Sequence, residues 1–467
     1  MTMAPLPLAV RETPVPGLLV VDLPVHGDAR GWFKENWQRA KMTALGLPDF
    51  APVQNNVSFN AEPGTTRGIH AEPWDKFVSV ASGRVFGAWV DLREGPSFGR
   101  VFHTEMGPET AVFVPRGVGN AFQALDEGTA YSYLVNDHWS ESAQSDYTFL
   151  NLADETVAVP WPIPLERAVL SEKDRAHPRL AEVTPMPPKQ TLVLGAGGQL
   201  GKALRSVFPN ADHADRSLID ITDRRSLERV EWTRYATVIN AAAYTRVDEA
   251  ESAEGRAAAW GVNAAAVADL ARIARAHALT LVHVSSDYVF DGRRPGAYTE
   301  DAALCPLSAY GQSKAAGDLA AAAAGRHYIL RTSWVVGDGA NFVRTMASLA
   351  ARGVDPEVVC DQRGRLTFAE DLAAAIAHLL AVRPEYGTYN VTCGGEPMSW
   401  AEVAARVFGL TGHDPARVTG VTAAEYFAGK QAAPRPANSV LDLQKIERTG
   451  FRPRPALRAL EVYLADR

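Results

Sequence analysis

TLVLGAGGQLG, residues 191–201, decides how the second half of this chain is expected to fold. An apolar run ends in clustered glycines and leads into a helical pattern, the strand–turn–helix context that a dinucleotide-binding fingerprint requires. Gly195 would permit the tight turn, Gly198 would let the backbone approach a pyrophosphate, and Gly201 would allow close packing of helix against strand. Exposed amides at the start of the helix would then bind the anion. The stretch therefore predicts a nucleotide-binding α/β fold.

A serine, a tyrosine and a lysine follow downstream at positions suited to reducing a ketone: Ser286, Tyr310 and Lys314. A phenol with a reference pKa of about 10 is a poor acid and a poor base at neutral pH. Because Lys314 follows Tyr310 by four residues on one helical face, we expect its charge to favour the phenolate and lower the pKa of Tyr310. The Ser286 hydroxyl would orient the substrate oxygen. Together with the glycine-rich turn, these residues predict a nicotinamide-dependent short-chain reductase that uses NADPH or NADH.

The choice between NADPH and NADH depends on the second strand of this fold and stays open. Asp215 could accept a hydrogen bond from a ribose hydroxyl, whereas Arg216 could bind a 2′-phosphate. Two solvated loop charges are an equally good interpretation of this pair.

Composition places the chain among soluble globular proteins. It has 467 residues, of which 46% are hydrophobic and 22% charged, and its net charge of -7 argues against a nucleic-acid partner. Its three cysteines, Cys305, Cys360 and Cys393, are widely spaced and predict neither a disulfide framework nor a zinc site. No apolar run reaches about 18 residues, and the N-terminus lacks a signal-peptide pattern. We therefore expect a cytoplasmic protein without a membrane partner.

The chain is too long for one ordinary hydrophobic core, and its pattern changes near residues 175–190. Before this point, short runs rich in β-branched and aromatic residues lie between turns, which predicts an all-β barrel or jelly roll. After it, strand-like runs alternate with Ala-rich helical patterns, as in a doubly wound parallel sheet. Prolines at 185, 187 and 188 indicate a linker. The expected domains are 1–180 and 190–467, joined by residues 181–189, and the second is expected to include a small substrate-binding part.

The first domain carries candidate chemistry of its own in His70, Lys76, Tyr133 and Asp174. In a β-barrel, residues on separate strands can converge on one lumen. A His oriented by an Asp is a general base, a Lys can stabilise an enolate oxygen, and a Tyr on the opposite face can return a proton. This set suits epimerisation next to a ketone. On the residues alone, a satisfied core histidine, a surface lysine and a packed tyrosine are the simpler interpretation.

The second domain resembles the dTDP-4-dehydrorhamnose reductases, which are extended short-chain dehydrogenases/reductases, over almost its whole length. The matching segments are 195–201, 220–223, 238–251, 286–292, 310–314, 330–334 and 435–439. The family usually has Thr where this chain has Ser286, and the hydroxyl is kept. The resemblance implies a Rossmann fold whose cofactor is bound by Gly195, Gly198, Gln199, Leu200, Gly201, Asp223, Asn240, Ala241, Ala242, Tyr310 and Lys314. It also implies a substrate site formed by Tyr244, Asp287, Trp334 and Arg435.

Residues 20–175 resemble the cupin-fold dTDP-4-dehydrorhamnose 3,5-epimerases, and this resemblance reverses the interpretation of the first domain. The matching segments are 28–35, 54–56, 67–70, 90–99, 114–117, 161–162 and 170–174, together with Tyr133. Carried over by position, His70 is the base, Asp174 its partner, Lys76 the oxyanion stabiliser and Tyr133 the acid. The resemblance implies that the nucleotide sugar is held by Arg30, Glu35, Gln54, Asn56 and Arg67.

Two departures from the epimerase pattern bear on whether carbon 3, carbon 5 or both are epimerised. The segment between His70 and Lys76 is shorter than the family typically has, which would displace Lys76. Asn120 also stands where the family has a His of the substrate site. Metal-binding cupins hold their metal with several histidines and a glutamate. This chain offers only His70 and Glu72 at those positions, and one imidazole is too few, so no metal site is expected.

Taken together, the two domains predict a fused enzyme of dTDP-L-rhamnose biosynthesis. The first would epimerise dTDP-4-dehydro-6-deoxy-D-glucose at carbons 3 and 5, and the second would reduce the 4-ketone, with Tyr310 protonating the developing alkoxide. We expect a homodimer formed through the cupin domain. Two alternatives stay open: an active reductase whose cupin is a scaffold or acts at one carbon only, and a non-catalytic nucleotide-binding regulatory protein.

Overall fold

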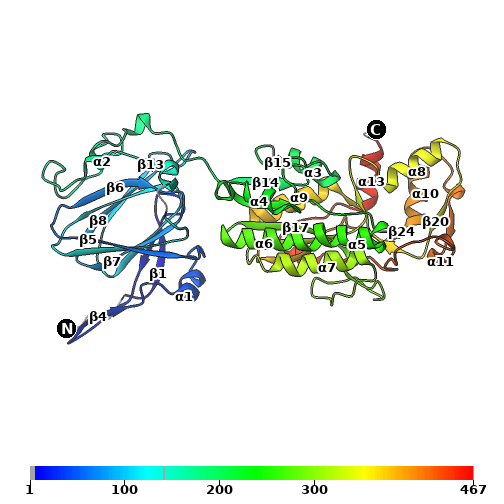
Figure 1. Ribbon diagram of the computed structural model, residues 1–467, viewed down its shortest axis with the longest axis horizontal. Coiled ribbons are helices and arrows are strands. Elements are labelled where there is room, and N and C mark those ends of the chain that lie inside the picture. Colours follow the sequence, from blue (N-terminus) through cyan, green and yellow to red (C-terminus); the bar gives the residue numbers. More distant parts are fainter. Residues whose placement is uncertain (1–5, 140–141, 466–467) are drawn as a thin grey trace. The chain divides into compact units, whose positions relative to one another are not determined.

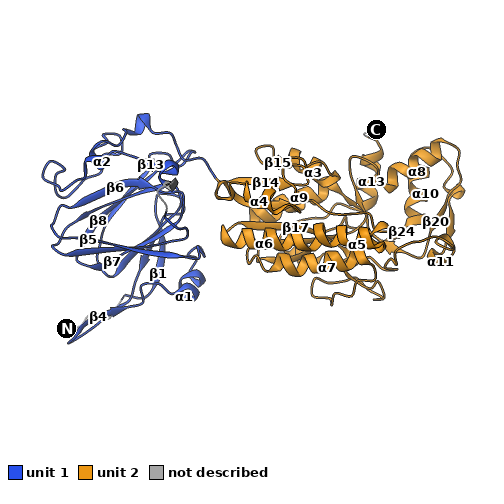
Figure 2. Cartoon of the chain, viewed as in Figure 1, with its two compact units in different colours: residues 1–188 blue, residues 189–467 orange. Residues whose placement is uncertain are grey.

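The computed structural model describes residues 6–139 and 142–465. The chain forms two compact units, residues 1–188 and 189–467, which Figure 2 shows in different colours. No helix among the described residues is long and apolar enough to cross a membrane. All three cysteines are free thiols, Cys393 buried and the other two exposed.

Two antiparallel sheets build the first unit (Figure 1). The first has the strand order β1 (Ala9–Glu12), β2 (Leu19–Asp22), β10 (Thr110–Val114), β7 (Lys76–Ser82), β12 (Thr129–Val135) and β5 (Gln54–Asn60). The second has the order β13 (Thr148–Phe149), β6 (Thr66–Ala71), β11 (Val118–Ala124), β8 (Val85–Asp91) and β9 (Val101–Met106). Consecutive strands of the chain often fall in different sheets, so the chain crosses repeatedly from one sheet to the other.

A core between these two sheets holds the first unit together. Side chains of a strand alternate between its two faces, so each sheet can present one apolar face. Val78 and Val112 from the first sheet join Trp89 and Phe122 from the second in one buried cluster, and Trp89 is fully buried. The predicted all-β barrel or jelly roll is therefore confirmed.

Smaller elements surround the two sheets. A hairpin of β3 (Val25–Asp28) and β4 (Gly31–Lys34) projects away from them, and α1 (Arg39–Ala44) follows it (Figure 1). The short helix α2 (Glu172–Arg175) begins after Ser171, whose hydroxyl accepts a hydrogen bond from the amide of Asp174. This N-cap fixes the direction in which α2 presents its side chains.

A six-stranded parallel sheet forms the centre of the second unit, as predicted. Its strands lie in the order β15 (Asp212–Ala214), β14 (Gln190–Leu194), β16 (Tyr235–Asn240), β17 (Thr280–Ser286), β18 (His327–Thr332) and β23 (Gly387–Asn390). The strand order therefore reverses at β14, between β15 and β16. In doubly wound sheets the crevice for a ligand opens at the carboxyl ends of the strands at such a point.

Helices cover both faces of this sheet. Leu192 and Leu194 of β14 belong to the cluster beneath α6 (Ala266–Ala276) and α7 (Ala309–Ala322), whereas Val193 faces α3 (Gln199–Val207) and α9 (Ala369–Val382). This alternation explains why β14 is apolar throughout: both of its faces are buried. The other helices around this sheet are α4 (Arg224–Glu228), α5 (Ala253–Trp260), the π-helical turn η5 (Gly261–Ala265) and α12 (Gln444–Arg448).

A smaller part with its own buried cluster completes the second unit. Its α10 (Trp400–Leu410) starts with a capping box in which Ser399 and Glu402 satisfy each other's backbone amides. The other helices are α8 (Phe342–Ala351), α11 (Ala423–Tyr426) and α13 (Ala456–Ala465). The short strands are β19 (Val335–Val336), β20 (Glu357–Val359), β21 (Arg363–Gly364), β22 (Thr367–Phe368), β24 (Met398–Ser399) and β25 (Thr419–Val421).

Candidate active sites

A cavity of about 930 Å³ in the first unit is lined by side chains from both sheets and from the segment around α2. Five of the residues that the sequence singles out line it: Arg67 and His70 on β6, Lys76 on β7, Tyr133 on β12 and Asp174 on α2. Their strands lie in different sheets, so groups on opposite walls can act on one bound molecule.

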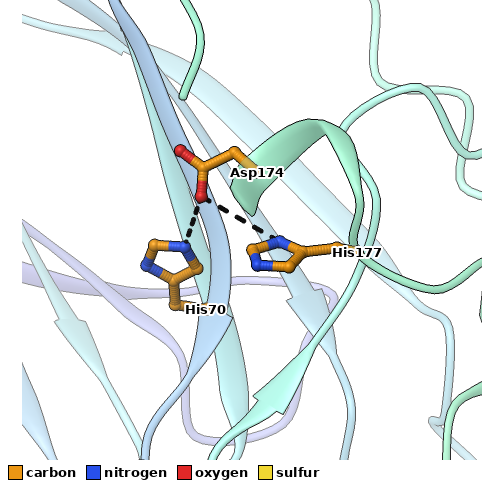
Figure 3. Close-up of side chains that lie close together, drawn as sticks. All are labelled: His70, Asp174 and His177. Atoms are coloured by element: carbon orange, nitrogen blue, oxygen red, sulfur yellow. Dashed lines mark hydrogen bonds and ion pairs between the residues drawn. The ribbon is translucent and has the colours of Figure 1, made fainter. Parts of the chain in front are cut away.

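His70 and Asp174 form a hydrogen-bonded dyad (Figure 3). Nε2 of His70 lies 2.8 Å from Oδ1 of Asp174, although 104 positions separate the two residues in the chain. Burial raises the pKa of Asp174, but the hydrogen bond and charge of His70, together with Ser171, outweigh it and leave that pKa below its ordinary value. Asp174 is therefore ionised at neutral pH and fixes the orientation of the imidazole.

Lys76 occupies the first position of β7 and is buried in the cavity wall. Its ammonium lies 2.8 Å from Oε2 of Glu72, and the same oxygen accepts a hydrogen bond of 2.7 Å from the indole of Trp74. The short segment after His70 thus still brings Lys76 into the cavity. From the sequence, Glu72 was considered only as a metal ligand, and its pairing with Lys76 was not predicted. The spacing of four residues between Glu72 and Lys76 was the signal in the sequence.

Tyr133 and Asn120 complete the walls around His70. Burial, followed by the charge of Glu72, raises the pKa of Tyr133, while Arg67 acts in the opposite direction. Tyr133 therefore keeps its proton at neutral pH. Asn120 pairs with His70 across β6 and β11, and its side-chain oxygen accepts a hydrogen bond of 3.0 Å from Tyr131.

Four expected substrate-binding residues lie outside the set that lines this cavity in the described chain. Arg30 stands at the turn of the β3–β4 hairpin, paired with Asp28, and Glu35 is paired with Lys41 at 2.6 Å. Two more, Gln54 and Asn56, are joined by a side-chain hydrogen bond of 2.8 Å on β5, where Asn56 is the cross-strand neighbour of Tyr133.

His177 is the residue at this site that sequence reasoning missed. Its Nδ1 lies 4.0 Å from Oδ1 of Asp174 (Figure 3). The ring of His177 stacks on Phe149 with centroids 4.7 Å apart. Burial, followed by the charge of His70, lowers the pKa of His177. Its position three residues after Asp174, just past α2, was the available signal.

The glycine-rich turn of the second unit has the geometry that its sequence predicts. Gly195 has a φ of +79°, and a Cβ there would overlap the backbone of Ala242. A Cβ on Gly201 would overlap the carbonyl oxygen of Gly195, so only glycine lets α3 approach β14 this closely. Gly198 is the N-cap of α3 and faces open space except for that same carbonyl.

A cavity of about 790 Å³ opens beside this turn, at the point where the strand order reverses. Of the expected residues, it is lined by Gly195, Gly198, Ala241, Ala242 and Tyr244, with Asp215 and Arg216 also in its wall. Arg216 is paired with Asp220 at 2.9 Å through Nε, and Asp215 accepts hydrogen bonds from Ser217.

The other expected cofactor residues are not among the described residues that line this cavity. Asn240 accepts a hydrogen bond from the amide of Ala242 and donates one of 3.2 Å to His283, whose pKa burial and Lys314 hold well below its ordinary value. Leu200 is buried in α3, and Gln199 donates a hydrogen bond to the carbonyl of Ala340. Another, Asp223, caps α4 by accepting from the amide of Arg225.

Ser286, Tyr310 and Lys314 come together where β17 meets α7. The Ser286 hydroxyl acts to lower the pKa of Tyr310, against the effect of burial. The expected lowering of the Tyr310 pKa is wrong: burial, followed by the charge of Asp287, raises it to about 12. Lys314 donates a hydrogen bond of 2.6 Å to the carbonyl of Val284, and burial lowers its own pKa to about 8. Tyr310 is therefore a protonated donor at neutral pH.

Two of the expected substrate residues of the second unit, Asp287 and Arg435, lie near this trio. Asp287 accepts a hydrogen bond of 3.1 Å from Ser286, and burial raises its pKa to about 6. Arg435 is paired with Asp248 at 2.8 Å and interacts with Tyr288, whose ring centroid lies 5.5 Å from that of Tyr310. Another, Trp334, stacks on Trp400 with centroids 3.7 Å apart.

Comparisons with known proteins match each unit separately. Residues 189–467 match the family model of the RmlD substrate binding domain, and residues 12–182 match that of dTDP-4-dehydrorhamnose 3,5-epimerase. A Streptococcus pyogenes protein named RmlC homolog is 51% identical over 189 residues, which are 39% of this chain and 95% of that protein.

Relatives that match the second unit include two dTDP-4-dehydrorhamnose reductases. The dTDP-4-dehydrorhamnose reductase of Aggregatibacter actinomycetemcomitans is 37% identical over 290 residues, 58% of this chain and 96% of that protein. The crystal structure of a dTDP-4-dehydrorhamnose reductase from Bacillus anthracis in complex with NADP is 33% identical, with a TM-score of 0.56. That match covers 60% of this chain and 99% of the Bacillus chain.

Proposed function

This chain belongs to the dTDP-4-dehydrorhamnose 3,5-epimerase family in its first unit and to the family of the RmlD substrate binding domain in its second, and we propose that it catalyses two consecutive reactions. The first unit epimerises dTDP-4-dehydro-6-deoxy-D-glucose at carbons 3 and 5. The second reduces the 4-ketone of the product with NADPH and releases dTDP-L-rhamnose. The chain is thus a bifunctional enzyme of dTDP-L-rhamnose biosynthesis.

In the first reaction, His70 removes the acidic proton beside the ketone. With Nε2 hydrogen-bonded to the ionised Asp174, the neutral imidazole keeps its lone pair on Nδ1, which is the basic atom. Lys76, paired with Glu72, stabilises the negative oxygen of the enolate. Tyr133 lies in the sheet opposite the one that carries His70, and it keeps its proton at neutral pH. It can therefore return a proton to the opposite face of the sugar.

In the second reaction, the crevice beside Gly198 suits NADPH. The position lacks the Cβ that would fill the space at the start of α3, and free amides there favour a pyrophosphate. When bound, the dihydronicotinamide supplies the hydride that carbon 4 accepts. Ser286 orients the substrate oxygen, and Tyr310 donates its proton to that oxygen. The need for NADPH also supports a cytoplasmic location.

The observation that carries this proposal is that each unit assembles a set of its own: the dyad of His70 and Asp174 in one, and Ser286, Tyr310 and Lys314 where β17 meets α7 in the other. NADPH oxidation with dTDP-4-dehydro-6-deoxy-D-glucose tests it. We expect oxidation to proceed without any added protein, and a separate 3,5-epimerase to leave its extent unchanged. Oxidation that requires the separate epimerase would show that the first unit is a scaffold.

The oligomeric state is part of the proposal: we infer a homodimer formed through the first unit. Trp32 and Phe33 on the β3–β4 hairpin are 46% and 65% exposed, and Val57 and Phe59 on β5 are 64% and 66% exposed. Apolar side chains left exposed on the hairpin and on the edge strand β5 favour burial against a second copy.

Dimerisation also accounts for the position of Arg30, because a hairpin that reaches a second copy can bring this residue to the partner's cavity. Light scattering tests this inference. We expect a dimer for the wild type and a monomer for Phe33→Asp. A monomeric wild type would refute the inference.

A further inference from the structure

Three possible metal ligands converge at one wall of the cavity in the first unit (Figure 3). His70, Asp174 and His177 each offer one donor atom, and these atoms all lie within 4.8 Å of one another. The distances to Oδ1 of Asp174 are 2.8 Å from Nε2 of His70 and 4.0 Å from Nδ1 of His177. Around a tetrahedral Zn²⁺ with bonds of about 2.0–2.2 Å, neighbouring donor atoms are about 3.3–3.5 Å apart. The two separations from Asp174 lie on either side of this value, each within about 0.7 Å of it.

His177 supplies an independent indication of a ligand. Its Nδ1 is buried and lacks a hydrogen-bond partner among the described residues, because 4.0 Å to Asp174 is too long for one. A neutral imidazole carries a lone pair on one ring nitrogen, and this nitrogen can bind a cation. Buried polar atoms are nearly always satisfied, and an exception requires an explanation. A cation shared with Asp174 would satisfy Nδ1.

We propose that His70, Asp174 and His177 bind a divalent first-row transition metal of the Zn²⁺ type, with the fourth coordination position open to the cavity. Two imidazoles and one carboxylate are a donor set that Zn²⁺ commonly has in proteins. The ion replaces the proton that His70 and Asp174 share, and the neutral imidazole of His70 then carries its proton on Nδ1. The sequence motif indicated only one imidazole for such a site, that of His70. The fold adds the imidazole of His177, which follows α2.

Metal binding at this place switches off the epimerase. The proton on Nδ1 of His70 removes the lone pair that would accept the substrate proton, and the ion holds the ring against Asp174. This consequence rests on the proposed function, whereas the binding of the metal does not. Ser286 and Tyr310 belong to the other unit, so reduction of a supplied intermediate continues.

Calorimetric titration of the full-length protein with Zn²⁺ tests the binding directly. We expect one site in the first unit with a dissociation constant in the micromolar range or below, and no binding of Mg²⁺, which prefers oxygen ligands. His177→Ala should weaken the binding of Zn²⁺ at least about tenfold, because it removes one of three protein ligands. His177→Gln serves as a second variant should the alanine protein fail to fold. The matched control is His103→Ala, an exposed histidine on β9 outside the cavity, which should bind Zn²⁺ as the wild type does.

Solvent deuterium exchange into the 4-keto sugar is then measured at each Zn²⁺ concentration, relative to the metal-free rate of the same variant. Exchange by the wild type should fall with the occupancy found by calorimetry, while NADPH-dependent reduction stays constant. Equal affinity of wild type and His177→Ala for Zn²⁺ would overturn the site, as would a wild type that binds no Zn²⁺. Absence of exchange in the metal-free wild type would instead refute the proposed epimerase while leaving the binding result to stand.

Discussion

Burial sets the proton affinities of the residues that do the chemistry, and it acts in opposite directions on Tyr310 and Lys314. It disfavours the charged form of each, raising the pKa of the phenol to about 12 and lowering that of the ammonium to about 8. The sequence spacing correctly brought these two residues into one site. It did not reveal the pKa of Tyr310, because desolvation depends on what β17 and α7 enclose. The same limit hid His177, whose proximity to His70 arises only when β6 and the segment after α2 meet.

Replacing Lys314 by Met should stabilise the second unit at neutral pH. The unfolded lysine holds its proton up to a pH of about 10.4, and the folded one only up to about 8, so the unfolded state binds more protons between these values. The free energy of unfolding of the wild type therefore rises with pH across this window. Lys314→Met removes the free-energy cost of burying a charged lysine. It should raise the free energy of unfolding by about 1–3 kcal/mol at neutral pH, and this gain should shrink as the pH approaches about 10.

Thermal unfolding at several pH values measures this gain, with the transition of the second unit identified by its shift on adding NADPH. Lys202→Met, at a half-exposed lysine on α3, is the control and should change stability little. A Lys314→Met protein that is less stable at neutral pH would show that attraction to Asp318 outweighs the cost of burial.

Arg216 decides the choice between the two nicotinamide cofactors if it meets a 2′-phosphate. Among the described residues, Asp220 pairs with the Nε of Arg216 and no other partner is seen, and Arg216 lies in the wall of the cofactor cavity. Arg216→Ala should raise the Michaelis constant for NADPH about tenfold or more and leave that for NADH nearly unchanged, since a charge-assisted hydrogen bond contributes about 1.5–3 kcal/mol. Arg224→Ala, at an exposed arginine paired with Glu228 on α4, should affect neither. Equal effects of Arg216→Ala on both cofactors would discard the assignment.

Strands and helices bring these residues together. The sequence predicts some of the contacts between these elements and not others. The run of Leu192, Val193 and Leu194 before the glycines predicted a strand of a parallel sheet. The structure contains this strand as β14 and buries both of its faces. The barrel strands were recognisable as strands, but their order was not, because pairing between distant segments such as β7 and β12 leaves no local signal. The projecting β3–β4 hairpin was not foreseen either. Its position separates Arg30 and Glu35 from the cavity in which they were expected.

The contact between β14 and α3 offers a test of the glycine-rich turn. In Gly201→Ala, the new methyl group would overlap the carbonyl of Gly195 and force α3 away from the sheet. We expect the affinity for NADPH to fall at least about tenfold, because the amides at the start of α3 move with the helix. Gly296→Ala, where a Cβ meets nothing within 4 Å, is the matched control and should bind NADPH normally. Normal binding by Gly201→Ala would show that the turn adapts to a larger side chain. Fluorescence titration with NADPH measures the affinity.

The whole chain consists of two units with separate cores, and each contains the residues of one reaction. The sequence indicated a division into two domains, because short β-rich runs give way to Ala-rich helical patterns, which is a change of fold class. Prolines 185, 187 and 188 lie near this change. Residues of different units share no chemistry in the proposed mechanism, so substitutions in one should leave the other active.

A pair of variants in the full-length chain checks this independence. His70→Asn should lose deuterium exchange yet reduce the intermediate supplied by a separate epimerase, because its Nδ1 base is absent while Tyr310 is untouched. Lys314→Met should do the reverse, exchanging deuterium without oxidising NADPH, because it removes an ammonium that the family resemblance assigns to cofactor binding. Loss of both activities in a folded His70→Asn protein, judged by circular dichroism, would contradict the existence of two independent sites.

Proton NMR of the product formed in deuterated water tests the two-step reaction most directly. The enzyme is incubated with dTDP-4-dehydro-6-deoxy-D-glucose and NADPH, and the hydrogen at each ring carbon is identified. We expect dTDP-L-rhamnose with deuterium at carbons 3 and 5, which exchange with solvent during epimerisation, and protium at carbon 4, which NADPH supplies. A reduced sugar that keeps protium and the D-configuration at both carbons 3 and 5 would mean that the first unit does not epimerise, and would contradict the proposed function.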